Sequence, residues 1–342
     1  MYQEFFGLRE LPFELTPNPR FLFLTTQHRE ALSNLQYGLA TNKAATVLIG
    51  EAGTGKTTLL RTALESEMCK RVRCVYINNP ALTRSEFLET LAHGFDLGRD
   101  AAASKAVFLT ELERLLTRHR AGGGAIALVV DEAQRLSDEL LEEVRLLANI
   151  ETAEEKLLPL VLAGQPELAE RLNTSGLRQL KQRVSLRCEI APFNLTETAA
   201  YIAARIRLAG GEAVRLFTRE AVTLIYERSG GIPRTINVIC DNALLSGFAA
   251  ARKPVARDMV LEVCRDFDLH GDDRERLLMK GVESGEASPG PPAGSEGGVA
   301  LPTDTRSRAT QAPNEAITDE HGGQTGGRLE AARPTGFSLF RR

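Results

Sequence analysis

The chain carries a short glycine-rich run with a lysine and a hydroxyl at its end, a combination that can bind phosphate. The spacing G-x-x-x-x-G-K-[ST] is matched by Gly50, Glu51, Ala52, Gly53, Thr54, Gly55, Lys56 and Thr57. Glycines let backbone amides converge on a phosphate, and the N-terminus of a following helix adds its positive dipole end. We expect Lys56 to contact the β- and γ-phosphates and Thr57 to ligate Mg²⁺, with Thr58 beside them. The alternative is a flexible glycine turn with a chance lysine.

Two adjacent carboxylates, Asp131 and Glu132, end the apolar run 125–130. Acidic groups at the end of a buried strand are costly unless they meet a cation or transfer a proton. Asp131 is expected to orient Mg²⁺ through a water, and Glu132 to polarise the water that attacks the γ-phosphate. The alternative is an acidic pair stabilised by a helix dipole, from which no nucleotide chemistry follows.

A parallel sheet covered by helices would bring these groups together. Short apolar runs alternate with longer segments of helical period, which is typical of the α/β class. The turns that follow such strands gather at one edge of the sheet, where ligands bind. The predicted strands are Thr46–Ile49, Arg73–Ile77, Ala125–Val130, Leu157–Ala163 and Leu186–Ile190.

After Pro192 the strand pattern stops and a small all-α lid domain is predicted. Thr196 and Thr218 are expected to be N-caps, and Pro233 suits a first helical turn. The predicted helices are Thr196–Ala209, Thr218–Ser229, Pro233–Ala250 and Arg257–Phe267. The domain boundaries that we expect are an aromatic and proline-containing arm over 1–30, a core over 31–192, the lid over 193–270, and a linker and tail over 271–342.

Composition favours a globular protein with more than one folding unit, because 342 residues with 43% hydrophobic side chains can bury a sizeable core. From residue 281 onward there are 11 Gly and 6 Pro but only 8 Leu, Ile, Val and Phe, which predicts a disordered tail. The final GFSLFRR is either a docking motif or an unstructured terminus. A net charge of −3 argues against coating nucleic acid by bulk charge, although a local basic patch stays open.

The compartment and redox state follow from what the sequence lacks. No window approaches the roughly 18 uninterrupted apolar residues of a membrane span, and charges interrupt the N-terminus where a signal peptide is apolar. We therefore predict a cytoplasmic protein. Five scattered cysteines favour reduced, buried thiols, and the five histidines are too far apart in the sequence to suggest a metal site.

Several motifs in one order resemble the AAA+ ATPases of the ExeA (general secretion pathway protein A) type, and more distantly the transposition ATPases of the TniB type. The resemblance covers roughly residues 1 to 268 and includes the segments GEAGTGKT (Walker A), LVVDEAQRL (Walker B), VLAGQPEL, LRQLKQRV, GGIPRTIN and CDNALL. It implies a P-loop NTPase core with a five-stranded parallel sheet, ATP and Mg²⁺ as ligands, and ATP hydrolysis.

The resemblance also implies roles for three residues outside the two Walker motifs. Gln165 is similar to the sensor-1 residue, and a polar turn residue is the alternative. Arg183 resembles an arginine finger that reaches the ATP site of a neighbouring subunit; a solvated basic helix end with Arg178 and Lys181 explains it equally well. Arg234 resembles sensor 2, which contacts the γ-phosphate within the same subunit.

Two further sets of residues have open interpretations. Asn78 and Asn79 follow the second predicted strand, where related proteins hold the catalytic glutamate inactive; either residue is otherwise a turn former. The N-terminal aromatic residues either cover the adenine or pack as an arm over the core. They are Phe5, Phe6, Phe13, Phe21 and Phe23, interleaved with Pro12, Pro17 and Pro19.

The function implied by the resemblance is an oligomeric ATP hydrolase that drives a secretion, pilus or exopolysaccharide export apparatus, peripheral at the inner membrane through a partner. We expect a departure from the type, in that no transmembrane segment or peptidoglycan-binding domain is predicted after the lid, and a membrane partner would have to supply coupling across the membrane. An alternative is an ATP-dependent DNA-binding regulator of transposition, in which Arg61, Lys70, Arg71 and Arg73, or the arginines of 178–187, contact phosphates. A third is an ATP-binding scaffold with negligible turnover.

Overall fold

The computed structural model describes residues 1–16, 19–78 and 81–269. The chain divides into two compact units, 1–285 and 286–342, and every described residue lies in the first. Asn79, the predicted tail and its GFSLFRR motif lie outside the described residues.

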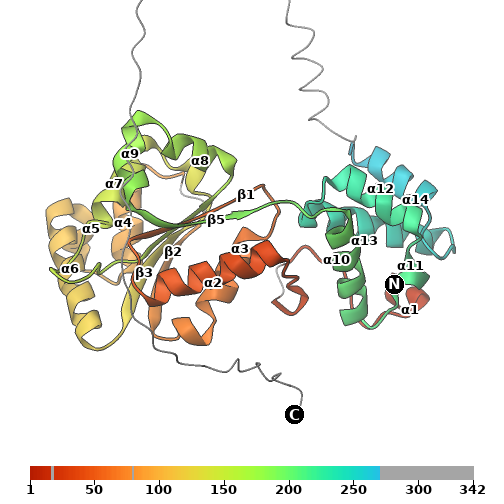
Figure 1. Cartoon of the computed structure of the whole chain (residues 1–342), viewed down its shortest axis with the longest axis horizontal. Coiled ribbons are helices and arrows are strands. Elements are labelled where there is room, and N and C mark those ends of the chain that lie inside the picture. Colours follow the sequence, from red (N-terminus) through yellow and green to blue (C-terminus); the bar gives the residue numbers. More distant parts are fainter. Residues whose placement is uncertain (17–18, 79–80, 270–342) are drawn as a thin grey trace, which may run out of the picture. The chain divides into compact units, whose positions relative to one another are not determined.

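Five parallel strands form one sheet in the order β2-β3-β4-β1-β5, which confirms the predicted fold class (Figure 1). The phosphate-binding run follows β1, and the carboxylate pair follows β3, two strands away across β4. The strands are β1 (Ala45–Gly50), β2 (Val72–Ile77), β3 (Ala125–Val130), β4 (Leu160–Gly164) and β5 (Val184–Ile190).

The predicted fourth strand begins three residues too early. Leu157 and Leu158 are buried, but they lie in the segment before β4, which begins at Leu160. Pro159 separates them from the strand, and a proline has no N–H to donate to a sheet ladder. The apolar character of Leu157 and Leu158 therefore indicates that they are buried, and not that they pair in the sheet.

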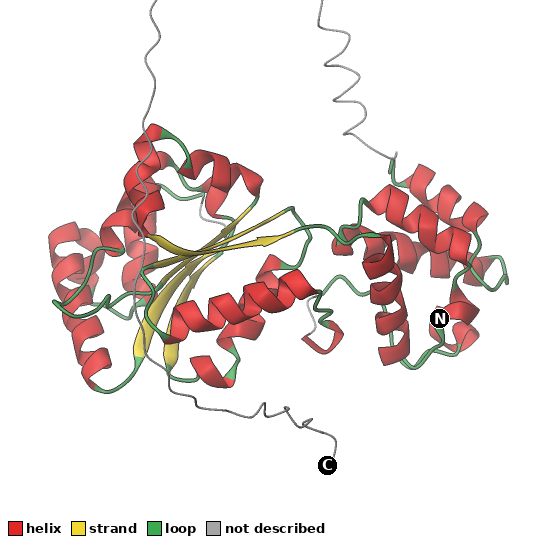
Figure 2. Cartoon of the chain, viewed as in Figure 1, coloured by secondary structure: helices red, strands yellow, loops and turns green. Residues whose placement is uncertain are grey.

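Helices cover both faces of the sheet (Figure 2). Side chains of successive strand residues point to opposite faces, so neighbouring strand residues pack against different helices. Val47 and Ile49 pack into one apolar cluster, and Leu48 packs into the other. Two helices contribute to the Leu48 cluster, namely α2 (Thr26–Ala40) and α3 (Lys56–Leu64). The Val47 face is covered by α4 (Arg84–Gly94), α5 (Arg99–Ala103), α6 (Lys105–Ala121), α7 (Asp138–Leu147), α8 (Pro166–Leu172) and α9 (Arg178–Arg183).

A third apolar cluster belongs to the predicted lid, which is helical throughout. The expected N-cap Thr218 accepts a hydrogen bond from the Ala221 amide, and Pro233 opens its helix. Thr196 as an N-cap is wrong: Asn194 caps that helix, and its side chain and Glu197 form a reciprocal capping box. The helices are α1 (Tyr2–Phe6), α10 (Leu195–Leu208), α11 (Ala213–Leu216), α12 (Arg219–Ser229), α13 (Pro233–Ala249) and α14 (Arg257–Asp266).

The N-terminal aromatic residues divide between two places. Phe6 and Phe13 are buried in the apolar cluster of the lid and Phe5 packs against it, as a packing arm would. Phe21 and Phe23 line the cavity beside the glycine-rich loop, and Phe23 also packs against the lid cluster. Each of the two interpretations of the aromatic residues therefore fits part of the set.

Gly231, between α12 and α13, occupies a backbone position that excludes a side chain. Its φ is +74°, and a Cβ there would lie 1.9 Å from the carbonyl oxygen of Phe193. The Phe193 amide donates to the Gly231 carbonyl at 2.9 Å. This bond holds the segment after β5 against the turn between α12 and α13. Gly231→Ala is expected to lower the free energy of unfolding by about 3 kcal/mol or more, measured by chemical denaturation.

Gly176→Ala is the matched control, since a Cβ on Gly176 meets nothing within 4 Å. Its free energy of unfolding is expected to stay within about 0.5 kcal/mol of wild type. Equal stability of the two variants would contradict the steric argument for Gly231.

Among the described residues, no helix combines the length and apolar character that crossing a membrane requires. All five cysteines are free thiols, four of them buried. Burial raises the pKa of the half-buried Cys74 thiol to about 12, so this thiol is protonated at neutral pH.

Candidate functional site

The glycine-rich loop connects β1 to α3, as the sequence predicts, and two of its glycines have left-handed backbone angles. The φ of Gly53 is +84° and that of Gly55 is +100°. A Cβ on Gly53 would lie 2.8 Å from the Cβ of Arg234, so this glycine also permits the close approach of α13. The Thr54 hydroxyl donates to the Glu51 carbonyl at 2.8 Å and closes the turn.

Lys56 is buried at the first position of α3, and its ammonium lies under the loop. The Nζ atom donates to the carbonyl oxygens of Gly50 at 2.8 Å and of Glu51 at 3.1 Å. Burial lowers the pKa of Lys56 below its ordinary value, and the nearby carboxylates of Glu132 and Asp131 oppose this shift. A buried cation therefore faces the acidic pair at the same edge of the sheet.

Asp131 joins the end of β3 to the start of α3. Its side chain is 1% exposed, and Oδ2 accepts hydrogen bonds from the Thr57 hydroxyl at 2.6 Å and from the Tyr76 phenol at 2.7 Å. Burial, and then the contact with Asp131, raise the pKa of Tyr76, so the phenol is a donor. Sequence analysis missed Tyr76, because only the register between β2 and β3 brings it to the acidic pair.

Glu132 has a left-handed backbone, with φ of +54°. Its Oε2 accepts from the side-chain amides of Gln134 at 2.7 Å and Gln165 at 3.3 Å. The structure thus brings Gln165, which follows β4, to the carboxylate of Glu132. Gln134 was missed, and Asn78, which is exposed after β2, is not the source of either hydrogen bond.

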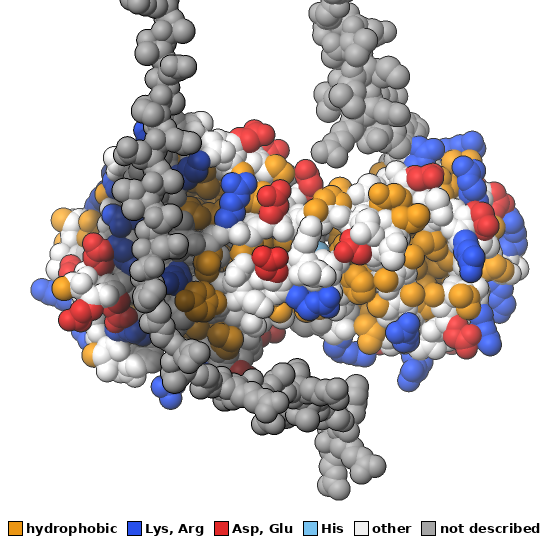
Figure 3. All heavy atoms as spheres, viewed as in Figure 1, with side chains coloured by type: hydrophobic (Ala, Val, Ile, Leu, Met, Phe, Trp, Pro, Cys, Tyr) orange, Lys and Arg blue, Asp and Glu red, His pale blue; other side chains and the backbone are white. Residues whose placement is uncertain are grey.

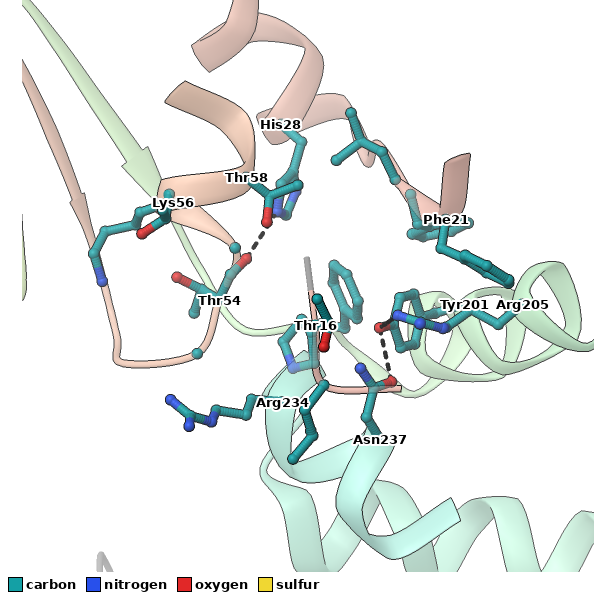
Figure 4. Close-up of a pocket in the computed structure, with 18 of the residues that line it drawn as sticks. Thr16, Phe21, His28, Thr54, Lys56, Thr58, Tyr201, Arg205, Arg234 and Asn237 are labelled. Atoms are coloured by element: carbon teal, nitrogen blue, oxygen red, sulfur yellow. Dashed lines mark hydrogen bonds between the residues drawn. The ribbon is translucent and has the colours of Figure 1, made fainter. Parts of the chain in front are cut away.

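A cavity of about 400 Å³ extends from the loop to the helical lid (Figure 4). Lys56 and Thr54 lie on one side of it, and Tyr201, Arg205 and Asn237 lie on the other. The end far from the lysine is aromatic and is lined by Phe21, Phe23, His28, Phe193 and Tyr201. One end therefore presents a cation and amides, and the other presents flat apolar rings.

Arg205 fixes the direction of a hydrogen-bond network at the aromatic end. Its guanidinium lies 4.8 Å from the centre of the Phe21 ring and donates to the Tyr201 hydroxyl at 2.8 Å. Arginine only donates, so the Tyr201 proton goes to Asn237 Oδ1 at 2.9 Å, and the amide nitrogen of Asn237 is left for another partner. None of these three residues was predicted from the sequence. The spacing of Tyr201 and Arg205 places them on one face of a helix, and this could have suggested that their side chains interact.

His28 ties α2 to the glycine-rich loop from the same aromatic end. Its Nε2 lies 3.3 Å from the Thr54 carbonyl oxygen and its Nδ1 lies 2.8 Å from the Thr25 hydroxyl. A carbonyl only accepts, so Nε2 carries the proton and Nδ1 accepts from Thr25. Burial lowers the pKa of His28, although the bond to Thr54 opposes the shift.

Comparison with known proteins identifies the type of domain. A family profile described as an AAA domain matches residues 40–172. General secretion pathway protein A of Aeromonas hydrophila is 41% identical over 249 residues, which are 73% of this chain and 45% of that protein. The chain therefore contains an AAA domain and is similar to general secretion pathway protein A. This confirms the resemblance inferred from the motifs, although the chain spans less than half the length of that relative.

Two solved structures have the same fold as this AAA protein at low sequence identity. ORC2 of Aeropyrum pernix superposes with a TM-score of 0.58 at 17% identity, covering 79% of this chain and 75% of that one. Cdc6p of Pyrobaculum aerophilum gives a TM-score of 0.57 at 19% identity, covering 78% and 73%. At this identity the likeness concerns the fold alone.

The two arginines expected in the AAA site have different positions. Arg234 opens α13, lines the cavity, and its backbone amide donates to the Gly53 carbonyl at 3.3 Å. Arg183 ends α9, is half-buried, and is not among the residues that line the cavity. Burial, and then the nearby Arg183, lower the pKa of Lys156, so cationic groups gather beside the end of α9.

The donors at the acidic edge of this AAA site fit magnesium. Mg²⁺ prefers oxygen ligands and keeps several waters and phosphate oxygens in its shell. The Thr57 hydroxyl and the Asp131 carboxylate are such oxygens, and they already lie within 2.6 Å of one another. These two residues would hold the ion.

Two basic residues of the DNA alternative, Lys70 and Arg71, lie away from this site. Lys70 and Arg71 line a hollow of about 330 Å³ with Val72 and Ala125, at the starts of β2 and β3. The glycine-rich loop and the acidic pair follow the ends of strands. In a parallel sheet these are opposite edges, so Lys70 and Arg71 lie on a different surface, whereas Arg61 lies on α3, the helix that begins at Lys56.

Proposed function

We propose that this chain binds MgATP and hydrolyses it to ADP and phosphate. The observation that carries the proposal is that Lys56, Thr57, Asp131 and Glu132 meet at one edge of the sheet, with Thr57 donating to Asp131 at 2.6 Å. A cation, a hydroxyl and two carboxylates at one edge of the sheet suit a triphosphate and its counter-ion.

Each residue of the site has its own role in the proposed hydrolysis. Lys56 and the loop amides bind the phosphates, and Thr57 and Asp131 would hold a magnesium ion, which would neutralise negative charge. Glu132 takes a proton from water as the water oxygen attacks the γ-phosphorus. The bond from that phosphorus to the bridging oxygen breaks, and its electron pair leaves with ADP. Gln165 holds the carboxylate in place, and Arg234 contacts the γ-phosphate from the lid.

The aromatic end of the cavity suits a nucleobase. Phe21, Phe23 and the Tyr201–Arg205 pair offer flat surfaces for stacking, and Asn237 offers a donor to a ring nitrogen. The ORC2 structure of Aeropyrum pernix contains ADPNP and ADP complexes, which supports an adenine nucleotide for a chain of this fold.

The test is phosphate release from ATP by the full chain, with and without magnesium. We expect turnover that EDTA abolishes and added Mg²⁺ restores, because Thr57 and Asp131, which lie in hydrogen-bond contact, would hold the ion together. ATP binding without measurable turnover would favour the scaffold alternative and contradict hydrolysis. Absence of ATP binding would contradict the proposal as a whole.

Arg183 is proposed to act on the site of a neighbouring subunit in a homo-oligomer, because it lies outside the lining of the cavity of its own chain. Arg183→Ala is expected to lower turnover by about tenfold and to spare ATP affinity. Mixing Arg183→Ala chains with Glu132→Gln chains should restore activity, since each supplies the group that the other lacks. No recovery in the mixture would contradict a role in trans.

The biological role that we propose is work on a secretion, pilus or exopolysaccharide export apparatus, by a cytoplasmic protein held at the inner membrane by a partner. The name of the Aeromonas relative supports secretion. Apolar side chains gather on the lid in the view of Figure 3, and such surfaces often bind proteins. The exposed large apolar residues of the lid are Leu195, Leu208, Val214, Leu245 and Phe267.

A gel shift with duplex DNA separates this role from the transposition alternative. A protein partner as client predicts no ATP-dependent shift, even at low salt. An ATP-dependent shift that weakens as salt rises would favour DNA, because neutralised phosphates release counter-ions.

A further inference from the structure

Gln134 lies between the acidic pair and α7, in the short 3₁₀ turn Ala133–Arg135, and uses both ends of its amide. Its Nε2 donates to Oε2 of Glu132 at 2.7 Å, and its Oε1 accepts from the backbone amide of Gln165 at 3.1 Å. A carboxylate only accepts and a backbone amide only donates, so the orientation of the side-chain amide is dictated by its partners.

The protein backbone is adapted to this side chain. A Cβ on Gly164 would lie 2.8 Å from Oε1 of Gln134 and 2.8 Å from Cδ2 of Leu168, so a glycine at the end of β4 leaves room for the amide beside Leu168. Arg171 on α8 donates to the carbonyl oxygens of Gln134 at 2.8 Å and of Leu136 at 2.6 Å, and it also pairs with Asp138. The turn that carries Gln134 is therefore held from a second element.

We propose that Gln134 is a positioning residue for Glu132, an inference that rests on the proposed hydrolysis. Gln134 and Gln165 both donate to Oε2, which leaves Oε1 as the oxygen that takes the proton from water. Because Gln134 also binds the Gln165 backbone, the base and the sensor-like glutamine form one unit. Loss of the Gln134 amide frees the carboxylate to rotate and lowers the rate of the chemical step.

A role in loop structure alone makes a different prediction for one substitution. Gln134→Glu keeps an oxygen that accepts from the Gln165 amide, but it replaces the donor to Glu132 by a second carboxylate. A structural tie to Gln165 would survive this change. Positioning of Glu132 would not, because like charges at hydrogen-bond distance repel.

The experiment measures kcat and KM for phosphate release by the full chain, with ATP affinity and thermal unfolding measured on the same samples. Gln134→Glu and Gln134→Ala are each expected to lower kcat by about tenfold or more, with KM unchanged. Glu142→Gln on α7 is the control, since its exposed side chain pairs with Arg145, and it should match wild type.

A Gln134→Glu protein with wild-type kcat would overturn the positioning role and leave hydrolysis intact. A rise in KM with unchanged kcat would also overturn it, because that pattern indicates lost ATP binding. If Gln134→Glu does not fold, Gln134→Ala is the test. A lower kcat with unchanged KM would support the positioning role, and a higher KM with unchanged kcat would overturn it. Absence of magnesium-dependent turnover in the wild type would instead contradict the proposed function, and the inference with it.

Discussion

Lys56→Ala is expected to weaken ATP binding by about a hundredfold or more, and with it to abolish turnover at ordinary ATP concentrations. The reason is the position of the ammonium, which is buried beneath the glycine-rich loop and bonded to two of its carbonyl oxygens. Such a group is already desolvated and oriented before a phosphate arrives. Its contact with phosphate therefore costs little further reorganisation.

Titration of a fluorescent ATP analogue measures this effect directly. Lys70→Ala is the control, because Lys70 is an exposed lysine whose described partner is Glu67 three residues away. It should bind the analogue as wild type does. Wild-type affinity in a folded Lys56→Ala protein would contradict the phosphate-binding role of the loop.

The sequence was sufficient for the parts of the site that lie in one continuous segment. Gly50 to Thr57 span the end of β1, a turn and the start of α3, and each residue type has a local reason to be there. Asp131 and Glu132 could be predicted for the same reason, since a buried strand ending in carboxylates is unusual. Thr57 and Asp131 are 74 positions apart, and their contact followed from the shared edge of a parallel sheet.

The groups that orient these residues could not be read from any segment alone. Tyr76 reaches Asp131 because β2 pairs with β3 in one particular register. Arg205 and Asn237 meet the aromatic end of the cavity only after the lid helices have packed. Gln134 stands inside a recognised motif, but its importance depends on a glycine, Gly164, in a different strand of the sheet.

Two predictions about the ends of elements were wrong, namely Thr196 as an N-cap and Leu157 as the start of the fourth strand. In both cases, neighbouring residues of similar character could each have marked the end of the element. Asn194 and Thr196 both carry side chains that can cap a helix, and the helix begins after Asn194 because Glu197 completes a capping box there. Leu157 and Leu158 are as apolar as strand residues, but Pro159 cannot donate to the sheet, and β4 begins only at Leu160. Sequence patterns locate such elements well and their ends less well.

Glu132→Gln is expected to lower turnover by about a hundredfold to ten thousandfold while ATP affinity is kept. Glutamine has the same shape, and its amide oxygen can still accept from Gln134 and Gln165, so the hydrogen bonds that hold the side chain survive. What is lost is the ability to take a proton from water. Binding and hydrolysis should therefore separate in this variant, whereas Lys56→Ala loses both.

Phosphate release and analogue titration on the same preparation measure this separation. Glu139→Gln is the matched control: it makes the same change on α7, at an exposed residue that pairs with Arg84, and it should hydrolyse ATP at the wild-type rate. Equal phosphate release by Glu132→Gln and wild type would show that another group takes the proton. The hydrogen bonds that Gln134 and Gln165 donate to Glu132 would then have a structural role only, and the base would have to be sought among the other polar groups that line the cavity.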